Sequence, residues 1–200
     1  MGLSIHYSGS FRESAFLPKM INEVIDIVET CKWDYHVYEK DFPNNIDTSN
    51  HYNENIYGIC FTPPECETVS LCFLSNKRMS SPAHLKFFGK TNDKPEQKYL
   101  YMLSVKTQFA GEEIHKFIIE LFRYLKKKEY FENLEILDEG KYWETGDENL
   151  LHDIFKQYVD LLDSFSMAIK SAPLKKGESY EKYFMRLMEM IQNKNRDEIK

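Results

Sequence analysis

The chain has 200 residues, of which 42% are hydrophobic and 14% aromatic, and its formal net charge at pH 7 is −6. This length and aromatic content allow a substantial buried core and argue against disorder. The negative charge disfavours non-specific contact with the phosphate backbone of nucleic acids. No run reaches the roughly 20 apolar residues of a membrane span, and the first residues do not have the pattern of a signal peptide. We therefore expect a cytoplasmic protein that binds neither nucleic acid nor membranes.

The cysteines favour the same compartment. They are Cys31, Cys60, Cys66 and Cys72. A chain with an ample core does not need disulfides, and the spacing of the last three matches no zinc pattern, because zinc sites use two close pairs. Glu65 and Glu67 flank Cys66, and negative neighbours raise the pKa of a thiol. We therefore expect reduced cysteines without a nucleophilic role.

The chain begins with a short strand followed by a helix. Apolar and polar residues alternate over residues 3–7, which is the period of a strand. Ser14 is a suitable N-cap for a helix whose apolar stripe runs from Leu17 to Cys31. Pro18 lies in its first turn, where a missing N–H costs little.

The middle of the chain reads mainly as strands. Alternating or β-rich runs predict strands at residues 33–38, 57–61, 68–74, 85–88, 99–109 and 134–137. A polar, asparagine-rich segment at 42–55 predicts a loop. The double proline at 63–64 indicates the connection between two strands, because proline cannot donate to a ladder.

Helical periodicity dominates the remaining residues. Amphipathic stripes predict helices at 112–128, 147–172 and 179–192. A run of strands followed by helices predicts an α+β fold, with helices packed on one face of a mainly antiparallel sheet in a two-layer single domain. Pro173 and Gly177 interrupt the helical pattern. We expect a core domain over residues 1–172 and a C-terminal helix in 173–200 that packs on the core or on a partner chain.

One candidate site combines histidines and glutamates. Glu112 and His115 lie one helical turn apart, a spacing that helical metal sites use. His6 on the first strand completes a set of candidate metal ligands, with Glu112 or with Glu139, if the fold brings these residues together. The alternative is that Glu112 is a helix-start glutamate and the histidines are ordinary polar residues.

A second candidate site is the acidic turn at residues 138–144, where a strand meets a helix. Asp138, Tyr142 and Trp143 are its candidate binding residues. A tryptophan beside a carboxylate forms a binding patch or raises the pKa of the carboxyl for acid–base chemistry. The alternative is a structural turn whose aromatic pair packs under the following helix.

The sequence carries none of the common motifs for binding nucleotides or for zinc-protease, serine-hydrolase or kinase catalysis. We therefore expect a non-enzymatic binding or regulatory protein that acts through protein–protein contacts, with self-association as a homodimer through residues 179–192. The alternative is a metal-dependent or acid–base hydrolase. Its catalytic candidates are His6, His115, Glu139 and Glu144. The sequence specifies no cofactor.

Overall fold

The computed structural model describes residues 2–43, 51–91 and 93–198. The chain forms two compact units, the first ending at His152 and the second beginning at Asp153. The division lies inside a helix. The division that the sequence suggests, into a core domain over residues 1–172 and a C-terminal helix in 173–200, stays a prediction.

The first unit holds the strands. Within the described residues they are β1 (Ser4–Phe11), β2 (Asp34–Val37), β3 (Tyr57–Thr62), β4 (Val69–Phe73), β5 (Met79–Ser80), β6 (Leu103–Lys106) and β7 (Phe131–Asp138). They form one sheet in the order β6-β1-β7 and another in the order β2-β3-β4-β5. Every neighbouring pair in both sheets is antiparallel. The predicted α+β class with mainly antiparallel sheets is confirmed.

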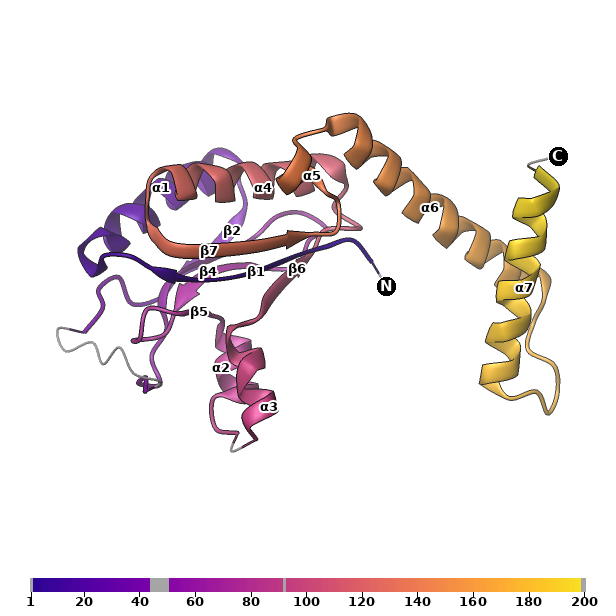
Figure 1. Cartoon of the computed structure of the whole chain (residues 1–200), viewed down its shortest axis with the longest axis horizontal. Helices are drawn as coiled ribbons and strands as arrows, with labels where there is room; N and C mark the ends of the chain where they lie inside the picture. Colours follow the sequence, from indigo (N-terminus) through magenta and orange to yellow (C-terminus); the bar gives the residue numbers. More distant parts are fainter. Residues whose placement is uncertain (1, 44–50, 92, 199–200) are drawn as a thin grey trace. The chain divides into compact units, whose positions relative to one another are not determined.

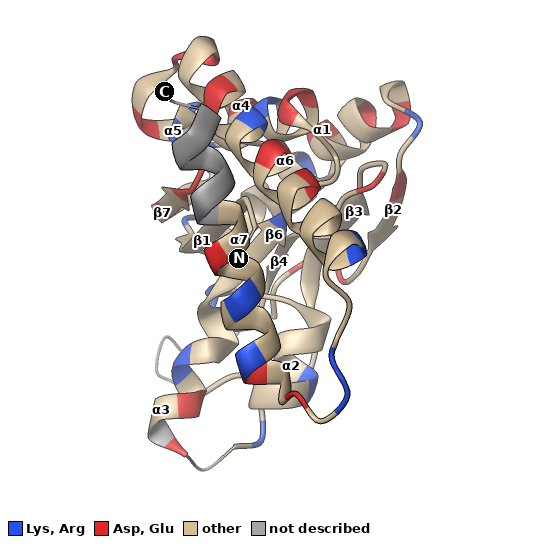
Figure 2. Ribbon diagram, turned by 90° about the vertical axis from the view of Figure 1, so that its right-hand side faces the viewer, with Lys and Arg blue, Asp and Glu red and all other residues tan. Residues whose placement is uncertain are grey.

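The helices of the first unit differ in length and position. They are η1 (Ser14–Phe16), α1 (Leu17–Thr30), α2 (Pro82–Phe88), α3 (Lys94–Gln97), η2 (Lys98–Tyr101), α4 (Glu112–Lys127) and α5 (Tyr142–Thr145). The long helices α1 and α4 lie on the same side of the strands, and the short α2 and α3 lie on the other side (Figures 1 and 2). The apolar faces of α1 and α4 are buried, as their 3.6-residue periodicity predicts.

A buried tyrosine joins the two sheets. The Tyr7 hydroxyl donates to the main-chain oxygen of Ser70 at 3.2 Å and accepts the main-chain N–H of Ser70 at 2.9 Å. Its ring contacts Phe122 of α4, with centroids 4.9 Å apart. One side chain from β1 therefore connects β4 with the helix layer, and burial raises the pKa of its hydroxyl well above the ordinary value.

Of the predicted strands, the one at 85–88 is wrong and the one at 99–109 is right only in part. Residues 85–88 belong to α2, because Ser81 caps this helix and Pro82 occupies its first turn. The strand expected over 99–109 is only β6, since residues 98–101 form η2 and the chain turns after Lys106. There Thr107 and Gln108 both donate main-chain N–H groups to the carbonyl of Leu3. The loop expected over 42–55 includes residues 44–50, which lie outside the described residues.

The second unit is a helical hairpin. Helix α6 (Glu148–Ser171) begins in the first unit and continues into the second, where α7 (Tyr180–Glu198) packs against its C-terminal part. Their shared core is small. It consists of Ala168, Ala172, Tyr183, Leu187 and Ile191, with Phe165 packed beside it. The predicted helix at 179–192 is confirmed and extends further. None of the described helices combines the length and apolar character that crossing a membrane requires.

The link between the sheets gives a first prediction. In Tyr7→Phe the buried main-chain N–H of Ser70 loses an acceptor, and we expect the free energy of unfolding to fall by about 1–3 kcal/mol. Urea denaturation measures this loss. The control is Tyr124→Phe, because the Tyr124 hydroxyl hydrogen-bonds to Glu23 at the protein surface, and its loss should cost less than about 0.5 kcal/mol. Equal effects in both variants would contradict a joining role for Tyr7.

Candidate functional site

A hydroxyl, an imidazole and a carboxylate meet in the interior of the first unit. Nδ1 of His115, on α4, lies 2.7 Å from the Thr107 hydroxyl oxygen. Nε2 of His115 lies 2.8 Å from Oδ1 of Asp138, at the end of β7. None of the three side chains has exposed surface. Thr107 also reaches the carbonyl of Leu3 at 3.4 Å, so the network ties together the ends of β1, β6 and β7.

The Asp138 carboxylate also organises the turn that follows it. Oδ1 accepts the main-chain N–H of Gly140 at 2.7 Å, and Oδ2 accepts that of Trp143 at 2.9 Å. Burial opposes ionisation of Asp138, but the hydrogen bond and charge of His115 and these two N–H groups outweigh it and lower the pKa of the carboxyl. A Cβ on Gly140 would lie 2.7 Å from Nε2 of His115, so the turn requires glycine there.

This buried network has the hydroxyl, imidazole and carboxylate order of a catalytic triad, but a substrate cannot reach its hydroxyl. A catalytic hydroxyl must reach a substrate, and its base must exchange protons with it. Thr107, His115 and Asp138 are completely enclosed. The network therefore stabilises the fold, and His115 and Asp138 are occupied by structural contacts.

His6 and Glu139 lie together on the solvent-exposed face of the β6-β1-β7 sheet. His6 Nε2 is 3.7 Å from Glu139 Oε1, and Oε2 of Glu139 accepts the main-chain N–H of Ser4 at 2.7 Å. Successive residues of a strand point to opposite faces, so Glu139 lies away from Asp138, and His6 away from the buried Ile5. The structure thus brings together His6 and Glu139 from the catalytic candidates, but not His115. Glu144 is exposed on α5.

The candidate metal ligands are dispersed. Glu112 pairs with His152 of α6, whose Nδ1 is 3.0 Å from Oε2 of Glu112, and both side chains are at the surface. His115, one turn along α4 from Glu112, points inward to Asp138. In the part of the chain that the structure describes, no three His, Cys, Asp or Glu side chains are grouped so that they could hold one metal ion. We assign no metal site to His6, Glu112 and His115.

The aromatic pair of the acidic turn is held by a cation. The Arg123 side chain on α4 donates from Nη2 to the carbonyls of Tyr142, at 2.6 Å, and Trp143, at 3.0 Å. The Lys126 ammonium lies 5.2 Å from the Trp143 ring centroid. Tyr142 is buried and Trp143 half-buried. Of the three binding candidates in this turn, Trp143 is the one with substantial exposed surface.

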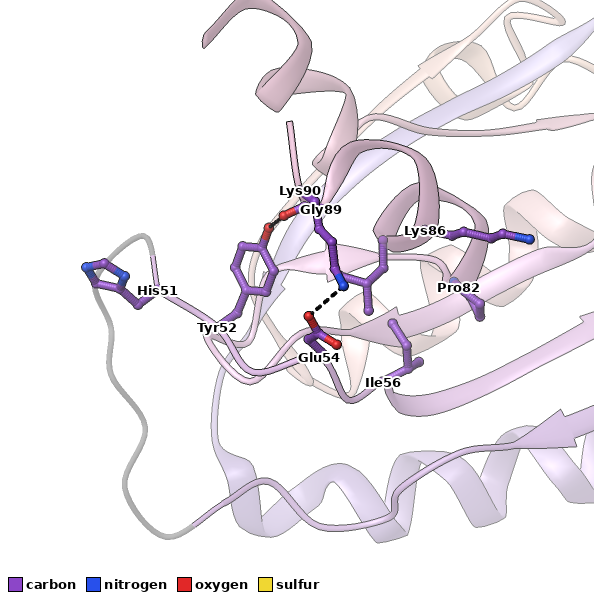
Figure 3. A pocket seen from close by; sticks show the side chains of 9 residues that line it. His51, Tyr52, Glu54, Ile56, Pro82, Lys86, Gly89 and Lys90 are labelled. Atoms are coloured by element: carbon purple, nitrogen blue, oxygen red, sulfur yellow. Dashed lines mark hydrogen bonds and ion pairs between the residues drawn. The ribbon is translucent and has the colours of Figure 1, made fainter. Parts of the chain in front are cut away.

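A cavity of about 700 Å³ lies beside α2. Ile56 and Leu85 line it with apolar surface, and the Lys90 ammonium lies 3.1 Å from Oε1 of Glu54 in an exposed ion pair (Figure 3). Tyr52 donates its hydroxyl to the carbonyl of Gly89 at 2.8 Å. The cavity is large enough for a small molecule.

Sequence reasoning missed the contact of Ser81 with His84. Their Oγ and Nδ1 atoms are 2.7 Å apart beside a second cavity, of about 410 Å³. Burial lowers the pKa of His84, although a main-chain hydrogen bond with Met102 opposes this. A serine followed three residues later by a polar side chain is an N-cap signal. Because the Ser81 hydroxyl also accepts the main-chain N–H of His84 at 3.1 Å, capping of α2 accounts for this pair.

The C-terminal hairpin carries an apolar face that its own helices do not cover, here called the open face. By helical spacing, one row of it lies on α6 and the other on α7. Its residues are Leu162, Phe165, Ile169, Tyr180, Phe184 and Met188. The rings of Phe165 and Phe184 stack with centroids 6.1 Å apart, which joins the two rows. Apart from the half-buried Phe165, these side chains are 41% to 73% exposed. Large exposed apolar surfaces are more frequent at interaction sites than elsewhere on soluble proteins.

Comparisons with known proteins give no match: no family model, no curated protein and no solved structure resembles this chain.

The buried carboxylate gives a second prediction. Asp138→Asn leaves at least one buried donor without a good acceptor, and we expect the free energy of unfolding at pH 7 to fall by about 3 kcal/mol. The folded state lowers the pKa of Asp138. The stabilisation from its charge is therefore complete above the unfolded pKa of about 4 and is lost as the pH falls through the folded pKa.

Urea unfolding of wild type and variant at several pH values measures this difference. We expect the gap between them to be large near neutral pH and to shrink below a pH of about 4. Glu135→Gln is the control, since Glu135 is an exposed carboxylate on the same strand, and it should change stability by less than about 0.5 kcal/mol. A gap that is the same at pH 3 and pH 7 would show that the charge of Asp138 does not matter.

Proposed function

We propose that this protein is a non-enzymatic binding protein that acts through protein–protein contact, and that the hairpin of α6 and α7 makes that contact. The observation that supports the proposal is the open face. Soluble proteins rarely leave large contiguous apolar surfaces uncovered unless another molecule binds there. Further methionines of the hairpin, Met167, Met185 and Met190, are also at least 40% exposed. Methionine gives an apolar surface that adapts to a partner.

The size of the hairpin supports the same proposal. A unit of fewer than about 70 residues rarely gains enough stability from a single core, and one of this size is marginal without help. The shared core of α6 and α7 contains five buried residues, two of them alanines. A partner packed over the open face would bury further apolar surface and so stabilise the hairpin. The sequence analysis expects that partner to come from self-association through residues 179–192.

The hydrolase alternative lacks a supporting observation. It requires His6, His115, Glu139 and Glu144 in one accessible place. Only His6 and Glu139 among them lie within 4.0 Å of each other, at 3.7 Å, and His115 is buried against Asp138. In the described part of the chain, neither the His6 ring nor the Glu139 carboxylate is hydrogen-bonded to a hydroxyl or thiol. We therefore propose binding rather than catalysis.

A third prediction concerns the compartment, for which we propose the cytoplasm. All four cysteines are free, and burial, with a smaller contribution from Glu67, raises the pKa of Cys66 to about 11, which slows its oxidation. Thiol titration of protein denatured without reductant, with exchange blocked, should find four reduced cysteines. Two or fewer would contradict a reducing compartment.

A fourth prediction tests the contact itself. A photo-crosslinking amino acid at position 184, on the open face, should form covalent adducts with protein in living cells. At position 182, which is exposed on the opposite side of α7, the same group should give few. Gel analysis of the full-length protein after irradiation measures both yields. Equal yields at the two positions would argue against the hairpin as the contact surface.

A further inference from the structure

We infer that the partner that covers the open face is a second copy of this chain, so that two hairpins form a four-helix bundle. This inference rests on the proposed function and names its partner. A pair of antiparallel helices with one apolar face is half of such a bundle. Twofold symmetry brings the same face of two copies together, which requires only that the face complement itself.

The composition of the open face meets this requirement. None of its six residues carries a charge, so the apposition of two identical faces brings no like charges together at its centre. Phe165 and Phe184, whose rings stack, each lie in the middle of one row, and Ile169 and Met188 come next along the rows of α6 and α7. In a symmetric pairing, the phenylalanines of both copies form one aromatic cluster, a contact with favourable geometry beyond simple burial.

The distribution of charge over the chain favours the hairpin as the place where two copies meet. The whole chain carries a net charge of −6, whereas basic and acidic residues nearly balance over residues 153–200. The excess negative charge therefore belongs to the first unit. Acidic and basic residues both occur along the ribbons of α6 and α7 (Figure 2). Two hairpins consequently approach without net repulsion, and their flanking charges of opposite sign can pair across the bundle edges.

The same charge pattern argues against a membrane surface as the occupant. Helices that lie on anionic membranes place lysine and arginine along the borders of their apolar face. On α7, the acidic residues Glu181 and Glu189 are mixed with Lys182 and Arg186. Arg186 is also engaged within the hairpin, because its Nη2 donates to Oε2 of Glu178 at 2.8 Å. The hairpin therefore lacks the basic border that membrane binding needs.

The test measures the molar mass of the purified full-length protein by light scattering during size-exclusion chromatography, at about 1–100 μM. We expect twice the mass of one chain at the higher concentrations. Phe184→Glu should raise the dimer dissociation constant by about 100-fold or more, because it buries a charge at the centre of the contact. Lys182→Glu is the matched control, since Lys182 is exposed on the side of α7 opposite to Phe184, and it should leave the dimer intact.

A second variant separates loss of pairing from loss of folding. Leu162→Glu changes the row on α6 and should also give monomers, and both dissociating variants should keep the wild-type unfolding transition of the first unit. A wild-type monomer at 100 μM overturns the inference, as does a dimer that both charge substitutions leave unchanged. If the purified protein is monomeric while position 184 still crosslinks selectively to other proteins in cells, the proposed function stands and the second copy is excluded as its partner.

Discussion

A buried carboxylate is the constraint on which the first unit depends. Asp138 has no exposed surface, and an ionised carboxylate removed from water is tolerated only when donors surround it. Here the donors come from His115 and from the main chain of Gly140 and Trp143. One helix, the end of one strand and the turn beyond it must therefore keep a fixed mutual arrangement. The absence of a side chain at residue 140 follows directly, because the imidazole of His115 occupies the space that a Cβ would need.

This constraint also explains why the exposed chemistry of the region is modest. The strand alternation that turns Asp138 inward turns Glu139 outward, toward His6 on the solvent-exposed face of the β6-β1-β7 sheet. The inward carboxylate of Asp138 accepts short hydrogen bonds from enclosed donors, whereas the outward carboxylate of Glu139 lies 3.7 Å from His6 and accepts the main-chain N–H of Ser4. The ionisable groups of this region are thus divided between an enclosed interior and an exposed surface. The same division separates Glu112, paired with His152 at the surface, from His115 one turn away.

Periodicity in the sequence predicts the class of the fold and the long helices, because amphipathic stripes are local. Residues 85–88 are not predicted correctly, because a short run of mostly apolar residues is compatible with either a strand or a short helix. The signals that favour a helix lie before the run, in the N-cap Ser81 and the proline that follows it. The end of β6 is mispredicted for another reason. The alternation of apolar and polar residues continues to Phe109, but the strand ends because Thr107 hydrogen-bonds to the carbonyl of Leu3, which is 104 residues away in sequence. The site is less predictable still: nothing near His115 indicates that its partners are Thr107 and Asp138, because the contacts depend on how β6, α4 and β7 pack.

The two units differ in what stabilises them, and this difference connects the fold to the proposed function. The first unit has an extensive core of large side chains between its helices and sheets. Among the described residues, the shared core of α6 and α7 holds five buried side chains, and aromatic and methionine side chains of the hairpin stay uncovered by its own helices. An isolated pair of helices of this kind is marginal in water. Under the proposed pairing, the folding and the association of the hairpin form a single equilibrium, in which the free energy of pairing stabilises the helices themselves. The stability of the hairpin would then depend on the concentration of its partner, whereas that of the first unit would not. A protein built in this way couples its availability for binding to its own abundance when the partner is a second copy of the chain.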